Sequence, residues 1–253
     1  MRYTLRAMPV YLLTDELVFP PPEGASREGV VAIGGDFRAE RLLLAYSQGI
    51  FPWPTEGMPL LWFSLDPRFV LKPCEAYVCK SLRKTMRKGH FEVRFDTAFE
   101  RVIRACGAAQ RPGQAGTWIT PELIEGYVKL HELGYAHSIE TWKGDELVGG
   151  LYGVSLGNIF FGESMFAIEP DASKVAFATM LGHFIDWGVE LVDCQVATDH
   201  LARFAASEWP QRRFLKAMRE LVAHPTRKGP WVANLSAKQA IDLLPARSEF
   251  EPA

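Results

Sequence analysis

The chain has 253 residues, with 28 Lys and Arg, 30 Asp and Glu, and a formal net charge of −2. Its 48% hydrophobic residues suffice for one large or two small folded domains, which excludes a chain that is disordered throughout. No uninterrupted apolar stretch reaches 18 residues, and the first 15 lack the core of a signal peptide, so we expect a cytoplasmic protein without a membrane span. Cysteines 74, 79, 106 and 194 are irregularly spaced, and we expect free thiols and no metal site.

Short segments separated by proline and glycine make up the first 66 residues. Three prolines in residues 19–24 favour an extended path, and Phe-Pro-Trp-Pro at residues 51–54 forms a second rigid loop. We therefore expect a small N-terminal domain over residues 1–66 with little regular structure. Its candidate elements are an apolar run over residues 30–33, a helix over 39–48 and an apolar run over 60–63.

Hydrophobic periodicity becomes regular after residue 66 and predicts an α+β domain with a mixed sheet over residues 67–233. The strands at 135–142, 146–154 and 158–166 are joined by short turns, which predicts an antiparallel meander. Residues 234–253 have weak patterning and are expected to form a loosely attached tail. The other predicted strands cover 69–71, 91–95 and 189–196, and the predicted helices cover 79–88, 97–106, 121–133, 171–187, a short segment near 198, and 214–223.

Two of these helices have residues at their start that are typical of helix caps. Thr120 precedes Pro121, so we expect the threonine to cap the helix over 121–133. We likewise expect Asp171 to cap the helix over 171–187, with Gly188 after its last turn.

The helix over 79–88 carries five basic residues at offsets 0, 3, 4, 7 and 8, which places them on one face. They are Lys80, Arg83, Lys84, Arg87 and Lys88. Like charges at this spacing repel one another, and a phosphate backbone would relieve the repulsion. The stripe is either a solvated helix face or a contact for the backbone of a nucleic acid.

Polar side chains interrupt two apolar strands. Glu163 lies within the strand over 158–166, and Asp193 and Gln195 lie within the strand over 189–196. Because side chains alternate along a strand, Asp193 and Gln195 share one face, and Glu163 shares a face with Met165. A buried carboxylate is costly unless it is paired, so these groups either make structural hydrogen bonds or form the polar wall of an active site.

Two tryptophans lie in predicted loops. Trp53 is flanked by prolines, and Trp118 lies in Gly-Thr-Trp-Ile-Thr. A large ring in a loop either covers the edge of a core or stacks on a nucleobase. Nearby, residues 110–115 match a loop that binds the pyrophosphate of acetyl-CoA. That segment follows a helix and contains a proline, so we do not expect acetyl-CoA to bind.

A series of motifs runs in order across residues 19–200. With these motifs the sequence resembles the bacterial leucyl/phenylalanyl-tRNA–protein transferase family. The matching motifs include Phe19-Pro-x-Pro-x-Gly-Ala25, Gly34-Gly-Asp36, Gln48-Gly-Ile-Phe-Pro-Trp53, Trp62-x-Ser64, Asp66-Pro-Arg68, Thr117-Trp-Ile-Thr120, His131-Glu-Leu-Gly134, Ala136-His-Ser-Ile-Glu140, Gly162-Glu-Ser-Met-Phe166, Ala172-Ser-Lys174, Asp193-Cys-Gln195 and Asp199-His200.

The resemblance implies a small N-terminal domain followed by a GNAT-like acyltransferase domain that uses no cofactor. It implies transfer of Leu or Phe from leucyl-tRNA or phenylalanyl-tRNA to the α-amino group of proteins that begin with Arg or Lys. The added residue would mark such a protein for degradation by the N-degron pathway.

The resemblance also implies roles for individual residues. Asp193 and Gln195 would orient or deprotonate the incoming amine, and Glu163 would contact a cationic group of the acceptor. The remaining roles are an apolar aminoacyl pocket formed by Phe161, Met165 and Met180, adenosine stacking by Trp53 and Trp118, and backbone contacts of tRNA by Lys80, Arg83, Lys84, Arg87 and Lys88.

Residues 203–211 depart from the family pattern. Family members usually have Ser-Leu-Gly-Ala followed by Ile-Pro-Arg, whereas this chain has Arg-Phe-Ala-Ala and Trp-Pro-Gln. The bulk of Phe204 and Trp209 is expected to alter local packing and acceptor preference. Two other functions fit the residues less well: an acetyl-CoA-dependent N-acetyltransferase, and a tRNA-binding module without catalysis.

Overall fold

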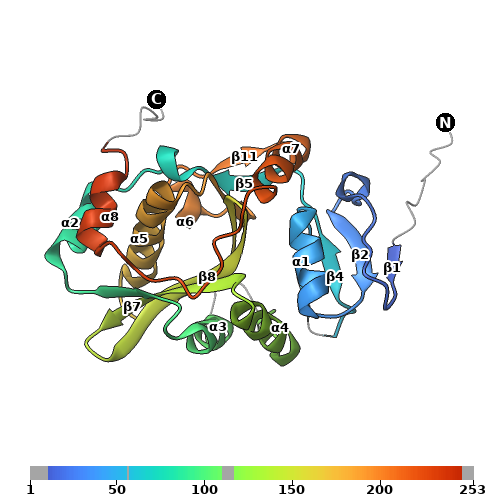
Figure 1. Ribbon diagram of the computed structural model, residues 1–253, viewed down its shortest axis with the longest axis horizontal. Coiled ribbons are helices and arrows are strands. Elements are labelled where there is room, and N and C mark those ends of the chain that lie inside the picture. The colour runs from blue at the N-terminus through green and yellow to red at the C-terminus, as the bar shows by residue number, and fades with distance from the viewer. Residues whose placement is uncertain (1–10, 56, 110–116, 247–253) are drawn as a thin grey trace.

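The computed structural model describes residues 11–55, 57–109 and 117–246, and these form two sheets with helices around them (Figure 1). The α+β class and the mixed sheet expected from the sequence are confirmed. Among the described residues no helix combines the length and the apolar character needed to cross a bilayer.

The N-terminal sheet has four strands in the order β1-β2-β4-β3. β1 pairs with β2 in parallel, and the other neighbours are antiparallel. The edge strands β1 and β3 are too short to show a periodic hydrophobic pattern, so they could not be predicted from the sequence. The bounds are β1 Tyr11–Leu13, β2 Val30–Gly34, β3 Phe51–Pro52 and β4 Leu61–Phe63, with a 3₁₀ turn at Pro22–Gly24 and α1 at Ala39–Ser47.

The larger sheet has seven strands in the order β11-β5-β10-β9-β8-β7-β6. The predicted meander is confirmed as β7, β8 and β9, which pair in antiparallel fashion. β9 and β10 are the parallel pair in this sheet. The bounds are β5 Arg68–Leu71, β6 Glu92–Phe95, β7 Ala136–Lys143, β8 Glu146–Leu156, β9 Ile159–Ala167, β10 Leu191–Gln195 and β11 Ser207–Trp209.

Helices cover both faces of the larger sheet (Figure 1). α5, α2 and α8 contribute to one core cluster, whereas α1, α3, α4 and α7 contribute to the other, which also includes Trp62 of the N-terminal sheet. The two sheets therefore share one of their cores. The bounds are α2 Lys80–Lys88, α3 Phe99–Ala108, α4 Pro121–Glu132, α5 Ala172–Trp187, α6 Asp199–Ala202, α7 Gln211–Val222 and α8 Ala237–Leu243, with a 3₁₀ turn at Pro73–Glu75.

The two predicted caps have different outcomes. Thr120 caps α4 as expected, because its hydroxyl oxygen accepts from the Leu123 N–H at 3.3 Å. Asp171 precedes α5 with a left-handed backbone, but its side chain makes no capping bond. Its carboxylate accepts instead from the Lys174 ammonium at 2.7 Å, so the prediction for Asp171 is corrected.

The described part of the C-terminal segment is more ordered than the weak pattern suggested. Ser236 and Gln239 form a reciprocal capping box at the start of α8. Ala240 and Ile241 are fully buried, and the helix packs on α5 and α2. A Cβ on Gly182 of α5 would lie 2.4 Å from the Ala240 carbonyl oxygen, so this glycine permits the close approach. Seven residues are too few for a clear helical period, which is why the sequence predicted a loose tail.

Candidate active site

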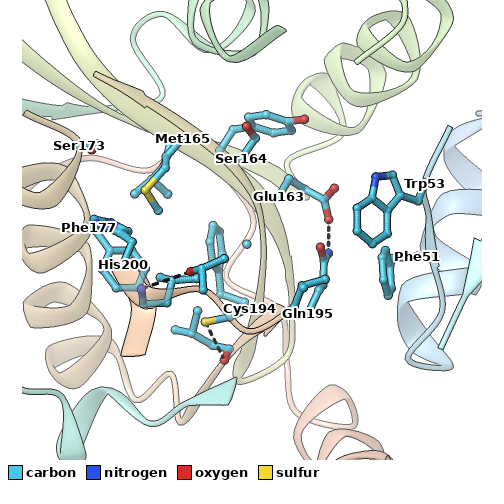
Figure 2. Close-up of a pocket in the computed structure, with 18 of the residues that line it drawn as sticks. Phe51, Trp53, Glu163, Ser164, Met165, Ser173, Phe177, Cys194, Gln195 and His200 are labelled. Atoms are coloured by element: carbon cyan, nitrogen blue, oxygen red, sulfur yellow. Dashed lines mark hydrogen bonds between the residues drawn. The ribbon is translucent and has the colours of Figure 1, made fainter. Parts of the chain in front are cut away.

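A cavity of about 500 Å³ opens where β9 and β10 cease to pair. Phe161 with Asp193 is the last paired position of the two strands, and the residues that follow on each strand line the cavity. Figure 2 shows it between α5 and the N-terminal segment that carries Phe51 and Trp53. Apolar side chains form its inner part, and Glu163 and Gln195 form a polar wall next to Trp53.

Each of the two diverging strands carries a β-bulge at this place. On β9, Glu163 lies between Gly162 and Ser164, which pair with consecutive residues of β8. On β10, Cys194 is the extra residue opposite β5. A bulge reverses the alternation of side chains beyond it, and it can direct a side chain into a site.

Glu163 lies at the centre of a hydrogen-bond network drawn from three other elements. Its Oε1 accepts from the Tyr46 hydroxyl at 2.6 Å and from the Gln195 amide nitrogen at 2.8 Å. Its Oε2 accepts from the Tyr127 hydroxyl at 3.1 Å, and the two tyrosine hydroxyls also contact each other. Burial raises the pKa of Glu163 to about 7, although the hydrogen bonds from Tyr46 and Gln195 act in the opposite direction. The carboxyl group can therefore change its charge near neutral pH.

The tyrosines bring the N-terminal part of the chain into the site. Tyr46 comes from α1 and Tyr127 from α4, and both side chains are fully buried. Burial raises the pKa of both hydroxyls well above the ordinary value, so they remain donors at neutral pH. Their positions in apolar helices are typical of core residues, so the sequence gives no sign of their contact with Glu163.

Asp193 lies next to the cavity without lining it. Its carboxylate accepts from Arg68 through Nε to Oδ1 at 2.8 Å and Nη2 to Oδ2 at 2.7 Å. Both side chains are 0% exposed. Unlike Asp193, Gln195 lines the cavity, and its amide nitrogen donates to Glu163 across the gap between β9 and β10. Asp193 and Gln195 thus meet different partners, although simple alternation places them on one face.

The three residues expected to form the aminoacyl pocket do not lie together in the cavity. Met165 lines the cavity, but Phe161 and Met180 are fully buried in the two core clusters and do not. The bulge at Glu163 explains the first difference, because it places Phe160 instead of Phe161 on the same side as Met165. Further apolar residues of the lining include Leu151, Phe177, Val192, Cys194, Val196 and Leu201.

Both tryptophans line the cavity. Trp53 is 37% exposed, and its ring contacts Phe63 edge-on at a centroid distance of 5.9 Å. Trp118 is half-buried and packs against the core that the two sheets share. Trp53 is therefore partly exposed next to the polar wall, whereas the larger part of Trp118 is covered. The segment 110–115, considered for acetyl-CoA, lies outside the described residues.

The basic residues of α2 divide into two groups. Lys80, Lys84 and Lys88 are exposed. Arg83 instead donates to the carbonyl oxygens of Val78 at 3.0 Å and Ile241 at 3.1 Å, and burial lowers its pKa. Arg83 therefore attaches α8 to α2, a use that sequence spacing did not indicate. Arg87 is exposed but pairs with Asp242 of α8 at 3.1 Å, and none of the five residues lines the cavity.

Residues 203–211, which depart from the family pattern, pack behind residues that line the cavity. Phe204 is buried, and its ring lies edge-on to Phe177 at 4.9 Å and to His200 at 5.6 Å. Phe177 and His200 line the cavity, so Phe204 supports two lining residues from behind. Trp209 lies on β11, where its ring packs under the Arg213 guanidinium at 3.7 Å.

Comparison with known proteins shows which family the chain is related to. A model of the leucyl/phenylalanyl-tRNA protein transferase family matches residues 70–219, and a model of its N-terminal domain matches residues 35–66. The chain belongs to this family. A relative named leucyl/phenylalanyl-tRNA–protein transferase from Myxococcus xanthus (strain DK1622) is 61% identical over 232 residues, which cover 91% of this chain and 99% of the relative.

Relatives of the same name from other bacteria are also similar over most of their length. The protein of Anaeromyxobacter sp. (strain Fw109-5) is 54% identical over 88% of this chain and 95% of its own. That of Magnetococcus marinus (strain ATCC BAA-1437 / JCM 17883 / MC-1) is 50% identical over 88% of this chain and 97% of its own. Membership of the family makes the chain a transferase, so the alternative of a binding module without catalysis is dropped.

Proposed function

We propose that the enzyme transfers Leu or Phe from leucyl-tRNA or phenylalanyl-tRNA to the α-amino group of proteins that begin with Arg or Lys. The observation that carries this proposal is the cavity itself, which joins an apolar interior to a polar Glu163–Gln195 wall beside two tryptophans. An apolar aminoacyl side chain fits the interior, and the rings of Trp53 and Trp118 offer stacking surfaces for the terminal adenosine. The cationic acceptor residue suits Glu163, which becomes negatively charged above its pKa of about 7.

The reaction requires little from the protein in acid–base chemistry. The α-amine attacks the carbonyl carbon of the aminoacyl ester, an amide bond forms, the ester C–O bond breaks, and the ribose oxygen leaves with a proton. An α-amino group has a pKa of about 8, so roughly a tenth is free base at neutral pH. Because the ester is already activated, positioning of the two substrates can supply much of the rate enhancement.

Gln195 is suited to hold the amine. Its amide nitrogen donates to Glu163 Oε1 at 2.8 Å, which leaves its carbonyl oxygen as the group that it can offer to an N–H of the acceptor. The cationic side chain of an N-terminal Arg or Lys would then pair with Glu163 on the same wall. In this arrangement Glu163 and Gln195 select the acceptor, and Met165, Phe160 and Phe177 select the aminoacyl group.

Broader parts of the proposal follow from the same family. We propose a domain boundary near residues 66–67, supported by the two adjacent family matches, and a GNAT-like fold for residues 67–233, supported by a mixed sheet with a cavity at its parallel pair. The exposed lysines of α2 would hold the tRNA backbone. A role in the N-degron pathway and a cytoplasmic location fit a substrate that is produced where translation takes place.

A peptide transfer assay tests the proposal. The enzyme is incubated with radiolabelled leucyl-tRNA and with one of two peptides that differ only in a first residue of Arg or Ala. We expect label on the Arg peptide, sensitive to prior RNase treatment of the donor, and at least tenfold less on the Ala peptide. Equal labelling of both peptides, or none with either leucyl-tRNA or phenylalanyl-tRNA, would contradict the proposed function.

A further inference from the structure

The Arg68–Asp193 ion pair is buried beside the cavity and is not explained by the chemistry above. Both oxygens of the carboxylate accept from the guanidinium, at 2.8 and 2.7 Å, and neither side chain is exposed. Burial of an ion pair removes both charges from water, so such a pair adds little net stability and is better explained by a need for fixed geometry. The two hydrogen bonds fix the position and the plane of the Asp193 carboxylate.

The guanidinium of Arg68 is itself held between two rings. Its central carbon lies 4.6 Å from the centre of the Phe51 ring and 4.7 Å from that of Phe214. Phe51 belongs to β3 of the N-terminal sheet and lines the cavity beside Trp53, whereas Phe214 belongs to α7. Arg68 therefore joins the N-terminal wall of the cavity to strand β10.

Asp193 connects Arg68 to the backbone of Gln195. Its Oδ1 also accepts from the Gln195 peptide N–H at 2.9 Å. Gln195 has a φ of 60°, in the left-handed region that residues other than glycine rarely adopt. Such a conformation persists where its surroundings hold it, and here it directs the Gln195 amide to Glu163.

We propose that Arg68 is a positioning residue, which fixes Asp193 as an anchor for the backbone of Gln195, and that Asp193 does not take the proton of the acceptor amine. The inference rests on the proposed function, in which Gln195 meets that amine. The Asp193 carboxylate accepts from the guanidinium and from a peptide N–H and does not line the cavity, so it lies in the wrong place for a general base.

The first test is a double-mutant cycle between Arg68 and Gln195. Arg68→Lys keeps the charge but loses the two-pronged hydrogen bond, and we expect kcat for the Arg peptide to fall tenfold or more while leucyl-tRNA binding changes less than twofold. Because Arg68 acts through Gln195, the same substitution in a Gln195→Ala background should cost less than twofold further. Equal losses in both backgrounds would overturn the inference.

The variant Asp193→Asn distinguishes the two roles that Asp193 could have, an anchor for the Gln195 backbone or a general base. Asn retains an oxygen for the Gln195 N–H but loses one bond to Arg68. We expect a loss similar to that of Arg68→Lys, with the rise of kcat/KM with pH retained but moved to lower pH, because the charge of Asp193 contributes to the raised pKa of Glu163. Disappearance of the rise in Asp193→Asn alone would assign the proton to Asp193 and overturn the inference.

Hydrogen exchange of the Gln195 peptide N–H gives a readout that does not depend on activity. We expect exchange to accelerate at least tenfold in Arg68→Lys and not in Arg212→Lys, an exposed arginine on α7 that serves as the matched control. If Arg68→Lys does not fold, Phe214→Leu loosens the same guanidinium more mildly, with an expected acceleration of about threefold. Unchanged exchange overturns the inference, whereas absent peptide transfer by the unchanged enzyme contradicts the proposed function alone.

Discussion

The carboxyl group of Glu163 combines burial with three hydrogen-bond donors, and these have opposite effects on its charge. Burial disfavours the carboxylate, and the bonds from Tyr46, Tyr127 and Gln195 favour it. The resulting pKa of about 7 lies well above the ordinary value of 4.5. In the proposed function a cationic acceptor prefers the charged form, so the charge of this one side chain would link acceptor binding to pH.

Glu163→Gln is predicted to weaken acceptor binding without affecting the donor. A hydrogen bond to a charged group contributes about 1.5–3 kcal/mol, so we expect KM for an N-terminal Arg peptide at pH 8 to rise about 10- to 100-fold. Leucyl-tRNA affinity, measured by filter binding, should change less than twofold. Glu132→Gln, at an exposed glutamate of α4, is the control and should leave both unchanged.

The pH dependence follows from the raised pKa of Glu163. The charged form increases as pH rises from 6 to 8, so KM of the unchanged enzyme should fall over that range relative to Glu163→Gln. The stability of the fold changes with pH in the opposite direction, because the folded state favours the protonated form of Glu163. Relative to the variant, the free energy of unfolding should fall from pH 4.5 to about 7 and level off above it. Parallel pH profiles of enzyme and variant would show that Glu163 does not titrate in this range.

At the scale of elements, the basic residues of α2 form two groups with different surroundings, although their sequence spacing is regular. Arg83 and Arg87 contact α8, whereas Lys84 and Lys88 remain exposed. Reversal of both lysines to Glu should therefore weaken tRNA binding at least tenfold and lower the salt slope of log K by about one unit per lost phosphate contact. Lys129→Glu on α4 is the control for a general change in net charge. An unchanged salt slope in the double variant would mean that tRNA does not contact α2.

Regular elements could be predicted from the sequence because each carries several residues of one period. The meander, α4 and α5 all contain enough residues for that pattern to appear. The bulges at Glu163 and Cys194 could not be predicted, since alternation carries no sign of an extra residue. That limit explains why Phe161 was placed in the pocket in place of Phe160.

The hydrogen-bond partners of Glu163 could not be predicted from the sequence for another reason. Tyr46 lies on a helix that precedes the larger sheet, and Tyr127 lies on a helix between β6 and β7. Their hydroxyls meet the carboxylate only when these distant segments fold together, and no local pattern encodes that contact. Arg68 did appear within a family motif, Asp66-Pro-Arg68, but its partner Asp193 lies 125 residues further along the chain.

For the whole molecule, the site depends on contacts between its two sheets. One core cluster contains Trp62 of the N-terminal sheet together with Val154 of β8, and a second cluster on the other face of the larger sheet contains Ile241 of α8. Two contacts connect the N-terminal part of the chain to β9 and β10. Tyr46 of α1 donates a hydrogen bond to Glu163 of β9, and the Phe51 ring packs on Arg68, which donates to Asp193 of β10. A packing defect far from the N-terminal sheet should then lower the stability of that sheet as well.

Ile241→Ala tests this coupling. Loss of a fully buried isoleucine costs about 2–5 kcal/mol, and in a cooperative molecule every part protected by global unfolding loses the same amount. We expect slowly exchanging amides of β4 and β8 to lose protection equally in hydrogen-exchange measurements. Leu243→Ala, on the same helix but at a side chain that is 44% exposed, should cost less than about 1 kcal/mol. Loss of protection in β8 with none in β4 would mean that the two sheets unfold independently, and that the polar wall can separate from Trp53 without unfolding of the larger sheet.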